Sequence, residues 1–263
     1  MSARVAITGL GLYLDGFPSA AAWRERAPQR EGEPQKPKGL AYDRVNRRRA
    51  SQMGRALGDA VHEAMQRADV DPVTTPVIVG SSIGEASAMI GLLDQMWREQ
   101  EPMSPAVFTV SVHNAASGLM SISMKNKGFT TSIAADYDTP AATLLEGIGL
   151  LATGQLAVVC ACADEASPKS LLEHAPHWDL LAGAVVLRRV PAKNALAHLS
   201  VAAPGGEAGR PAADPIPPAD IPAALDHNPQ AGLFDLIDAV LRGDRGSLRL
   251  DRGKGRGYRA ELS

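Results

Sequence analysis

An unbroken run of eight apolar residues, from Leu156 to Ala163, constrains the fold of this chain more than any other segment. Strands with one solvent-exposed face alternate apolar and polar residues. A continuous apolar strand is instead buried on both faces and needs helices on each side of the sheet. Further strands are predicted at Arg4–Gly11, Pro76–Gly80 and Leu180–Arg189, and helices at Ser51–Ala68, Ile83–Arg98 and Ala141–Thr153. This alternation predicts an α/β domain in which a sheet lies between helical layers.

The remaining stretches predict two more helices and a division of the chain. The segment Val112–Ile122 is rich in alanine, serine and glycine, which predicts a buried helix packed closely on another backbone, and a short helix is predicted from Trp23 onward. Residues 202–229 are crowded with proline and glycine and predict a surface loop. We expect one domain over residues 1–200, on which residues 201–263 pack as a linker, a helix (Asn228–Arg242) and a terminal hairpin (Ser247–Leu262).

The segment Gly128–Ala142 predicts a strand, a tight elbow and the start of a helix. Thr139 followed by Pro140 is a typical helix opening, with a capping hydroxyl before a proline at the first helical position. A thiol at such a helix start would have a lowered pKa and act as a nucleophile, but the elbow holds Asp136, Tyr137 and Asp138. Tyrosine, with an ordinary pKa of about 10, gains far less from the same field.

Composition excludes several classes of function. A net charge of −2 gives no strong field to attract nucleic acid, and no run of about eighteen apolar residues suggests a membrane span. The opening residues lack the apolar core of a signal peptide, so we expect a cytoplasmic protein. Cys160 and Cys162 share one face of a buried strand without a second cysteine pair or a nearby histidine, which predicts inert core thiols and no metal site.

The glycines do not indicate a nucleotide cofactor. Gly9 and Gly11 lack the third glycine of the dinucleotide fingerprint, and Gly80 and Gly84 are not followed by the lysine and hydroxyl of a phosphate loop. We interpret them as turn glycines at strand ends and predict no cofactor.

Five segments in register resemble successive landmarks of the β-ketoacyl synthases, in the amino-terminal half of their thiolase-type fold. They are Arg4–Gly11, Val77–Gly84, the stretch from Ser104 through Asn114 to Gly118, Gly128–Asp138 and Val159–Ser167. The resemblance covers residues 3–189, and Ser111–Gly118 with Ile133–Asp136 resembles the short chain-length-factor-like proteins of pigment and aryl polyene assembly. It implies a thiolase-like half fold: a mixed sheet with helices on both faces and a short carboxyl-terminal appendage.

The chain departs from the catalytic members of that family in two ways. Counted from Gly128, the family's nucleophilic cysteine falls on Tyr137, and the half that supplies two catalytic histidines has no counterpart here. His198 and His227 lie in the loop-rich tail, so those roles are not transferred to them. The resemblance therefore implies a noncatalytic subunit of fatty-acid or polyketide-type synthesis that pairs with a full-length β-ketoacyl synthase and forms part of a tunnel limiting product length.

A half fold also has a surface to cover. The face left by the missing half, and the strand edge near Ser132 that pairs across the family's dimer, must be shielded by the tail, a second copy or a partner. We therefore expect a homodimer or a heterodimer.

Candidate site residues each have a structural alternative. His113 and Asn114 could act on a thioester with Asp138, or could be a satisfied pair on a small-residue helix, and Asp136 and Asp138 could simply interact with the helix start. Tyr137 could shape an acyl tunnel or pack with its hydroxyl bonded nearby.

A basic run precedes the first long helix. It contains Arg44, Arg47, Arg48 and Arg49, which could dock an acidic acyl carrier protein or simply be solvated. Besides the accessory subunit, the sequence leaves open a small acyl-thioester hydrolase or dehydratase and a stand-alone carrier-binding module.

Overall fold

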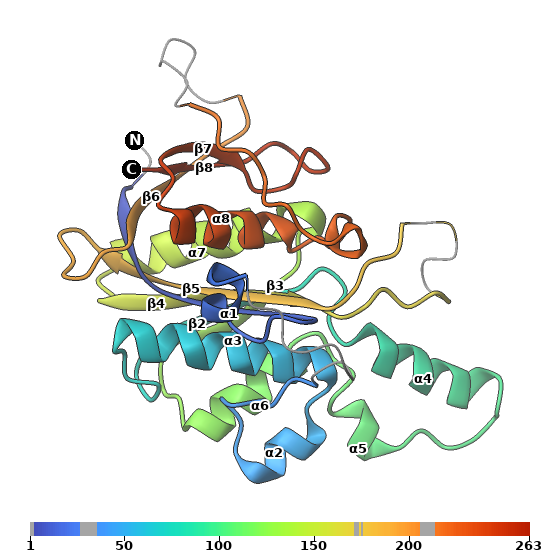
Figure 1. Cartoon of the computed structure of the whole chain (residues 1–263). Helices are drawn as coiled ribbons and strands as arrows, with labels where there is room; N and C mark the ends of the chain where they lie inside the picture. The colour runs from blue at the N-terminus through green and yellow to red at the C-terminus, as the bar shows by residue number, and fades with distance from the viewer. Residues whose placement is uncertain (1–2, 27–35, 171–173, 175, 206–213) are drawn as a thin grey trace.

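A computed structural model describes residues 3–26, 36–170, 174, 176–205 and 214–263, and it contains a single mixed sheet of eight strands. The strand order is β3-β2-β4-β5-β1-β6-β8-β7 (Figure 1). The strands are β1 (Val5–Leu14), β2 (Val77–Gly80), β3 (Thr130–Ile133), β4 (Ala157–Asp164), β5 (Leu181–Arg189), β6 (Ala197–Ala202), β7 (Gly246–Arg249) and β8 (Arg259–Leu262). β2 pairs in parallel with β3 and β4, and all other pairs are antiparallel.

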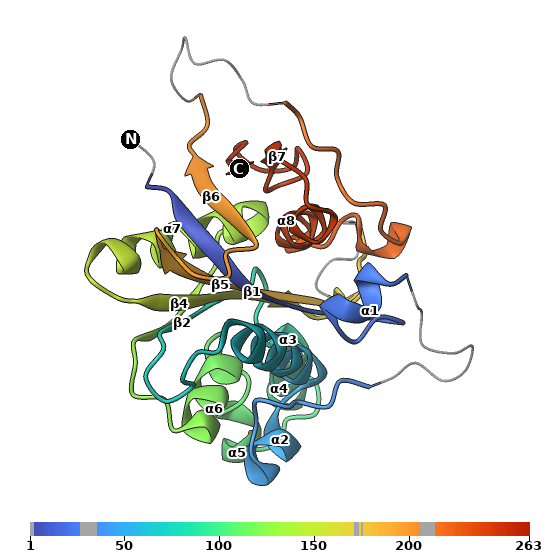
Figure 2. The same cartoon turned by 60° about the vertical axis from the view of Figure 1, so that its left-hand side comes forward.

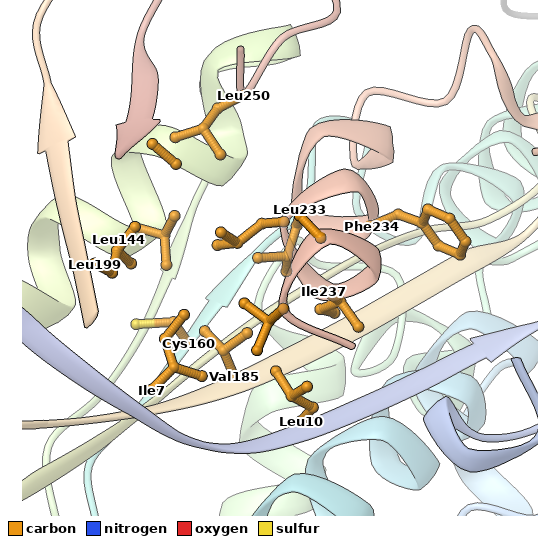
Figure 3. Packing of buried hydrophobic residues seen from close by; sticks show 14 of the residues in the cluster. Ile7, Leu10, Leu144, Cys160, Val185, Leu199, Leu233, Phe234, Ile237 and Leu250 are labelled. Atoms are coloured by element: carbon orange, nitrogen blue, oxygen red, sulfur yellow. The ribbon is translucent and has the colours of Figure 1, made fainter. Parts of the chain in front are cut away.

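Helices cover both faces of the sheet, as the apolar run of β4 predicts (Figures 1 and 2). They are α1 (Ala20–Arg24), α2 (Arg44–Arg49), α3 (Gln52–Ala68), α4 (Ala86–Trp97), α5 (Pro105–Phe108), α6 (Ala115–Met124), α7 (Thr139–Ala152) and α8 (Ala231–Arg242). α3 and α6 lie on one face, and α7 and α8 on the other. Each face has its own hydrophobic cluster, and the cluster under α7 and α8 is shown in Figure 3.

Two glycines of β1 explain how closely α3 approaches the sheet. A Cβ on Gly11 would lie 1.8 Å from the carbonyl oxygen of Ala60, and one on Gly9 would lie 2.2 Å from that of Ala64. The interpretation of these glycines as strand-end turns is wrong, because both lie inside β1 and are needed for backbone contact with the helix.

The carboxyl-terminal segment covers part of the sheet face on which α7 lies. Ten of the twelve residues of α8 are buried, and α8 packs beside α7 in the same cluster. The predicted terminal hairpin forms between β7 and β8 and joins the sheet through β6. The partly buried guanidinium of Arg252 bonds Asp235 on α8 and Asp226 before it, so ion pairs attach the turn of the hairpin to the helix.

Several boundaries differ from the sequence predictions. α1 ends at Arg24 rather than starting at Trp23, because Ser19 caps it earlier. α4 starts three residues later than predicted, after Gly84, whose φ of +58° does not fit a helix. The helix predicted at Val112–Ile122 runs from Ala115 to Met124 and is only partly buried.

The segment around His198 was also predicted wrongly. His198 lies on strand β6, which pairs with β1 and β8, and not in a loop. His227 does lie in the loop before α8. Within the described ranges, no helix is long and apolar enough to cross a membrane.

Candidate functional site

The elbow predicted at Asp136–Asp138 lies where β2, β3 and β4 end together, because parallel strands have their carboxyl ends on the same side of the sheet. Asp136–Asp138 form one turn of 3₁₀ helix before α7, and Asp136 has a left-handed φ of +50°. The Thr139 hydroxyl donates to the Asp136 carbonyl at 2.7 Å and accepts from the Ala135 N–H at 3.0 Å. Thr139 therefore braces the elbow from within α7, while Asp138 takes the capping position.

Both residues after Asp136 are bonded to the carboxyl-terminal segment. The Tyr137 hydroxyl donates to the carbonyl of His227 at 3.3 Å, and burial raises the pKa of this tyrosine, with the Asp136 and Asp226 carboxylates adding to the effect. The Asp138 carboxylate accepts from the Arg256 N–H at 3.0 Å. The position where the family resemblance places a nucleophile thus holds a phenol with a raised pKa.

A buried carboxylate is connected to the elbow through Ser82. Asp164, fully buried at the end of β4, accepts from the Ser81 hydroxyl at 2.6 Å, the Ser82 N–H at 3.0 Å and the Gln230 side-chain amide at 2.7 Å. The Ser82 hydroxyl in turn donates to the Asp136 carbonyl at 2.9 Å. Burial raises the pKa of Asp164 although these donors oppose the shift. Sequence reasoning missed this network, whose single signal is an aspartate ending an apolar strand.

The predicted pair of His113 and Asn114 lies beside the elbow, but its contacts do not indicate a catalytic role. His113 Nε2 is 2.8 Å from the carbonyl oxygen of Ser81, so this nitrogen carries the hydrogen. Asn114 is exposed at the start of α6, and its side chain caps no N–H of that helix. In the described part of the chain, no hydrogen bond or ion pair joins His113 to Asp138. His113 bonds the backbone carbonyl of Ser81, whereas Asp138 accepts from the backbone N–H of Arg256.

The basic run forms α2 and lies on the surface. Arg47 donates to the carbonyls of Gly39 and Tyr42, and Arg49 to the hydroxyl of Thr109 near the end of α5. Arg44 and Arg48 are exposed, and neither makes an ion pair with another described residue.

The two cysteines are free, fully buried thiols on β4. Burial raises the pKa of Cys162 to about 12 and that of Cys160 well above its usual value. Both thiols stay protonated at neutral pH, as the prediction of inert core cysteines requires. The described residues contain no cluster of three or more His, Cys, Asp or Glu side chains suited to a metal.

Replacing Tyr137 by cysteine tests the local geometry of the elbow. We expect native wild-type protein to resist iodoacetamide, because both of its thiols are buried, and Tyr137→Cys to take up one label. The positive end of α7 should hold the pKa of the new thiol below about 8.5. Thr153→Cys, at the exposed carboxyl end of the same helix, is the control. The pH dependence of labelling is measured by intact mass and gives the pKa of each new thiol. An elbow thiol that is not labelled, or whose pKa is higher than that of the Thr153→Cys thiol, contradicts the placement of position 137 at the start of α7.

Glu85, at the start of α4, predicts a pH-dependent stability. Its side chain is 5% exposed, bonds the Ser51 hydroxyl at 3.1 Å, and has a pKa raised to about 7 by burial. Because the folded pKa exceeds the unfolded value of 4.5, stability is greatest below the unfolded pKa and falls as pH rises through about 7. The loss is about 3 kcal/mol.

Glu85→Gln keeps an acceptor for Ser51 without the charge and should remove most of this loss. Urea unfolding at pH 5 and pH 8.5 measures it, with the exposed Glu99→Gln as control. An equal pH dependence in Glu85→Gln and wild type would refute the assignment.

Comparisons with known proteins give the family. Residues 21–214 match the model of the β-ketoacyl synthase, N-terminal domain. Comparison with curated proteins gave no match. One similar structure is the ketosynthase ApeO in complex with its chain length factor ApeC from Xenorhabdus doucetiae, with 20% identity, a TM-score of 0.69, and coverage of 100% of this chain and 99% of that chain.

Two further structures have the same fold. The ishigamide ketosynthase/chain length factor aligns with 16% identity and a TM-score of 0.67 over 98% of both chains. A type II polyketide synthase acyl-carrier protein in complex with its ketosynthase, AntDE:AntF, aligns with 16% identity and a TM-score of 0.57 over 77% of this chain and 70% of that one. These alignments confirm the predicted thiolase-like half fold. Because the family model spans well over half of the sequence, the protein belongs to the family of β-ketoacyl synthase N-terminal domains.

Proposed function

We propose that this protein is a noncatalytic, chain-length-factor-like subunit that pairs with an active β-ketoacyl synthase in fatty-acid or polyketide-type biosynthesis of the pigment type. The elbow carries the proposal. Its nucleophile position is Tyr137, whose hydroxyl bonds a backbone carbonyl and whose pKa is raised, so it does not supply an oxyanion at neutral pH. Two of the similar structures are ketosynthase and chain length factor complexes, aligned over nearly the whole of both chains.

The free edge of the sheet supports pairing with the ketosynthase. β3 ends the strand order, so one side of it has no neighbouring strand among the described residues. Phe129, directly before β3, is 47% exposed, and the helices that contact β3 present Ile122 on α6 and Leu145 on α7 to solvent. An unpaired edge flanked by exposed apolar side chains is a site where another chain adds.

The surface of α2 supports docking of an acidic acyl carrier protein to the same complex. Arg44 and Arg48 are exposed without ion pairs in the described part of the chain, and Val45 between them is 68% exposed. Guanidinium groups beside an apolar contact suit a helix with acidic and apolar residues.

We expect Arg44→Glu/Arg48→Glu to weaken carrier binding roughly tenfold at low salt and to flatten its salt dependence. Arg189→Glu/Lys193→Glu makes the same charge change at two exposed residues, the last of the central strand β5 and one in the loop after it, and is the control. Calorimetry with the carrier protein from the same gene cluster measures both. Equal losses in the two double variants would show that only net charge matters.

Reconstitution tests the proposed function. The intact ketosynthase from the same gene cluster, its carrier protein and malonyl thioester are incubated with and without this chain. We expect no thioester turnover by the chain alone, and condensation with a defined product length only when both subunits are present. Consumption of a model acyl thioester by the lone chain would instead assign it the hydrolase or dehydratase role.

A further inference from the structure

Residues 86–112, here called the arm, project beyond the end of the sheet (Figure 1) and have almost no core of their own. α4 buries only Ala86 and Leu92, and α5 buries no residue. Of the fifteen large apolar side chains that are exposed in the described structure, seven lie in this arm. Apolar surface concentrated in this way on a poorly packed element marks an interaction site.

Three of these side chains form a continuous stripe. Met89, Leu93 and Trp97 are 41%, 43% and 70% exposed, and they are spaced four residues apart along α4. Residues at this spacing lie one above the other on a single helix face. Such a face is the element recognised when a helix lies in an apolar groove, and an exposed tryptophan is a common anchor of such contacts.

Carboxylates stand at both ends of the stripe. Glu99 and Glu101, just after α4, are exposed and form no ion pair with another described residue, and Glu165 accepts from the Ser87 N–H at the start of α4. A second copy docked along α4, parallel or antiparallel, would bring carboxylates against carboxylates, and an anionic membrane would repel both ends. The charges therefore fit an apolar groove with a basic rim.

The base of the arm adjoins the proposed pairing edge. α4 follows β2 after five residues, and the last residue of β2, Gly80, is paired with Ile133 at the end of β3. A partner that extends the sheet at β3 is thus placed next to the start of the arm.

We propose that α4 is a clamp that docks its Met89, Leu93 and Trp97 stripe into a basic-rimmed apolar groove of the paired ketosynthase subunit. This inference rests on the proposed function, since the occupant is that ketosynthase. It assigns a second contact, separate from strand addition at β3.

The test compares Leu93→Ser and Trp97→Ser with Leu156→Ser, a leucine that is 71% exposed before β4, outside the arm. Affinity for the intact ketosynthase from the same gene cluster is measured by calorimetry after thermal unfolding has shown equal stability. We expect both arm variants to raise Kd at least ~10-fold and the control to leave it unchanged. Increasing salt should weaken wild-type binding, and Glu99→Gln/Glu101→Gln should reduce that salt effect.

Three results would overturn the inference. Pairing of the arm variants with wild-type affinity removes the clamp and leaves the proposed function standing. No pairing by the wild-type chain removes both. Flotation of the wild-type chain with phosphatidylglycerol vesicles, or self-association of the lone chain, that Trp97→Ser abolishes would assign the stripe to a membrane or to a second copy.

Discussion

Ser132→Pro is expected to weaken pairing with the ketosynthase strongly. Val77 N–H donates to the Phe129 carbonyl, and Ser81 N–H to that of Ile133, so odd-numbered residues of β3 face β2. In a parallel ladder the alternate residues, including Ser132, point their N–H and C=O to the other side, which is the free edge. Proline removes the outward N–H and leaves the bonds to β2, at a cost to pairing on the order of 3 kcal/mol, or ~100-fold in Kd.

Ser132→Ala is the matched control for that variant. It keeps the outward N–H and removes only the hydroxyl, which lies 2.8 Å from the hydroxyl of Ser117 on α6. Sedimentation of each variant with the ketosynthase should show a complex for Ser132→Ala and separate species for Ser132→Pro. If a folded Ser132→Pro chain pairs as tightly as the alanine variant, β3 is not the edge that adds to the partner.

Asp164→Ala should cause the largest loss of stability. The substitution leaves the Ser81 hydroxyl, the Ser82 N–H and the Gln230 amide without their acceptor in a fully buried site. We expect the free energy of unfolding to fall by about 3–5 kcal/mol, because several buried donors lose their partner at once. Urea unfolding measures the loss, and Asp94→Ala, which removes one exposed pair with Arg98, should cost no more than about 0.5 kcal/mol.

A double-mutant cycle separates the network from simple loss of packing. If Asp164 holds the start of α8 against the elbow, Asp164→Ala and Gln230→Leu should be coupled by about 1–3 kcal/mol. Strictly additive effects would mean that the carboxylate does not act through Gln230. The cycle therefore tests whether the carboxyl-terminal segment and the elbow form one unit.

The sequence predicts best those elements whose burial is local in pattern. β4 is apolar at every position but the last, and α3 repeats its apolar residues every three or four positions, so both appear where predicted. β6 alternates buried and half-buried residues, but it is short and runs into a proline- and glycine-rich stretch, so the sequence does not predict it as a strand. What supports β6 is pairing with β1 and β8, which are distant in sequence.

The candidate site is predictable only in part for the same reason. The strand, elbow and helix around Tyr137 follow from residues within fifteen positions of one another. The Asp164–Gln230 contact joins residues 66 apart, and the Asp138–Arg256 contact joins residues 118 apart. The exposure of Trp97 cannot be predicted from the sequence either. The apolar face of an amphipathic helix has the same spacing of residues whether it packs against its own chain or against another.

The native mass of the chain, expressed alone and together with the intact ketosynthase from the same gene cluster, tests the central claim most directly. The account predicts a one-to-one complex that replaces whatever species the lone chain forms. A stable homodimer that does not bind the ketosynthase would contradict it and would direct attention to thioester turnover by the lone chain.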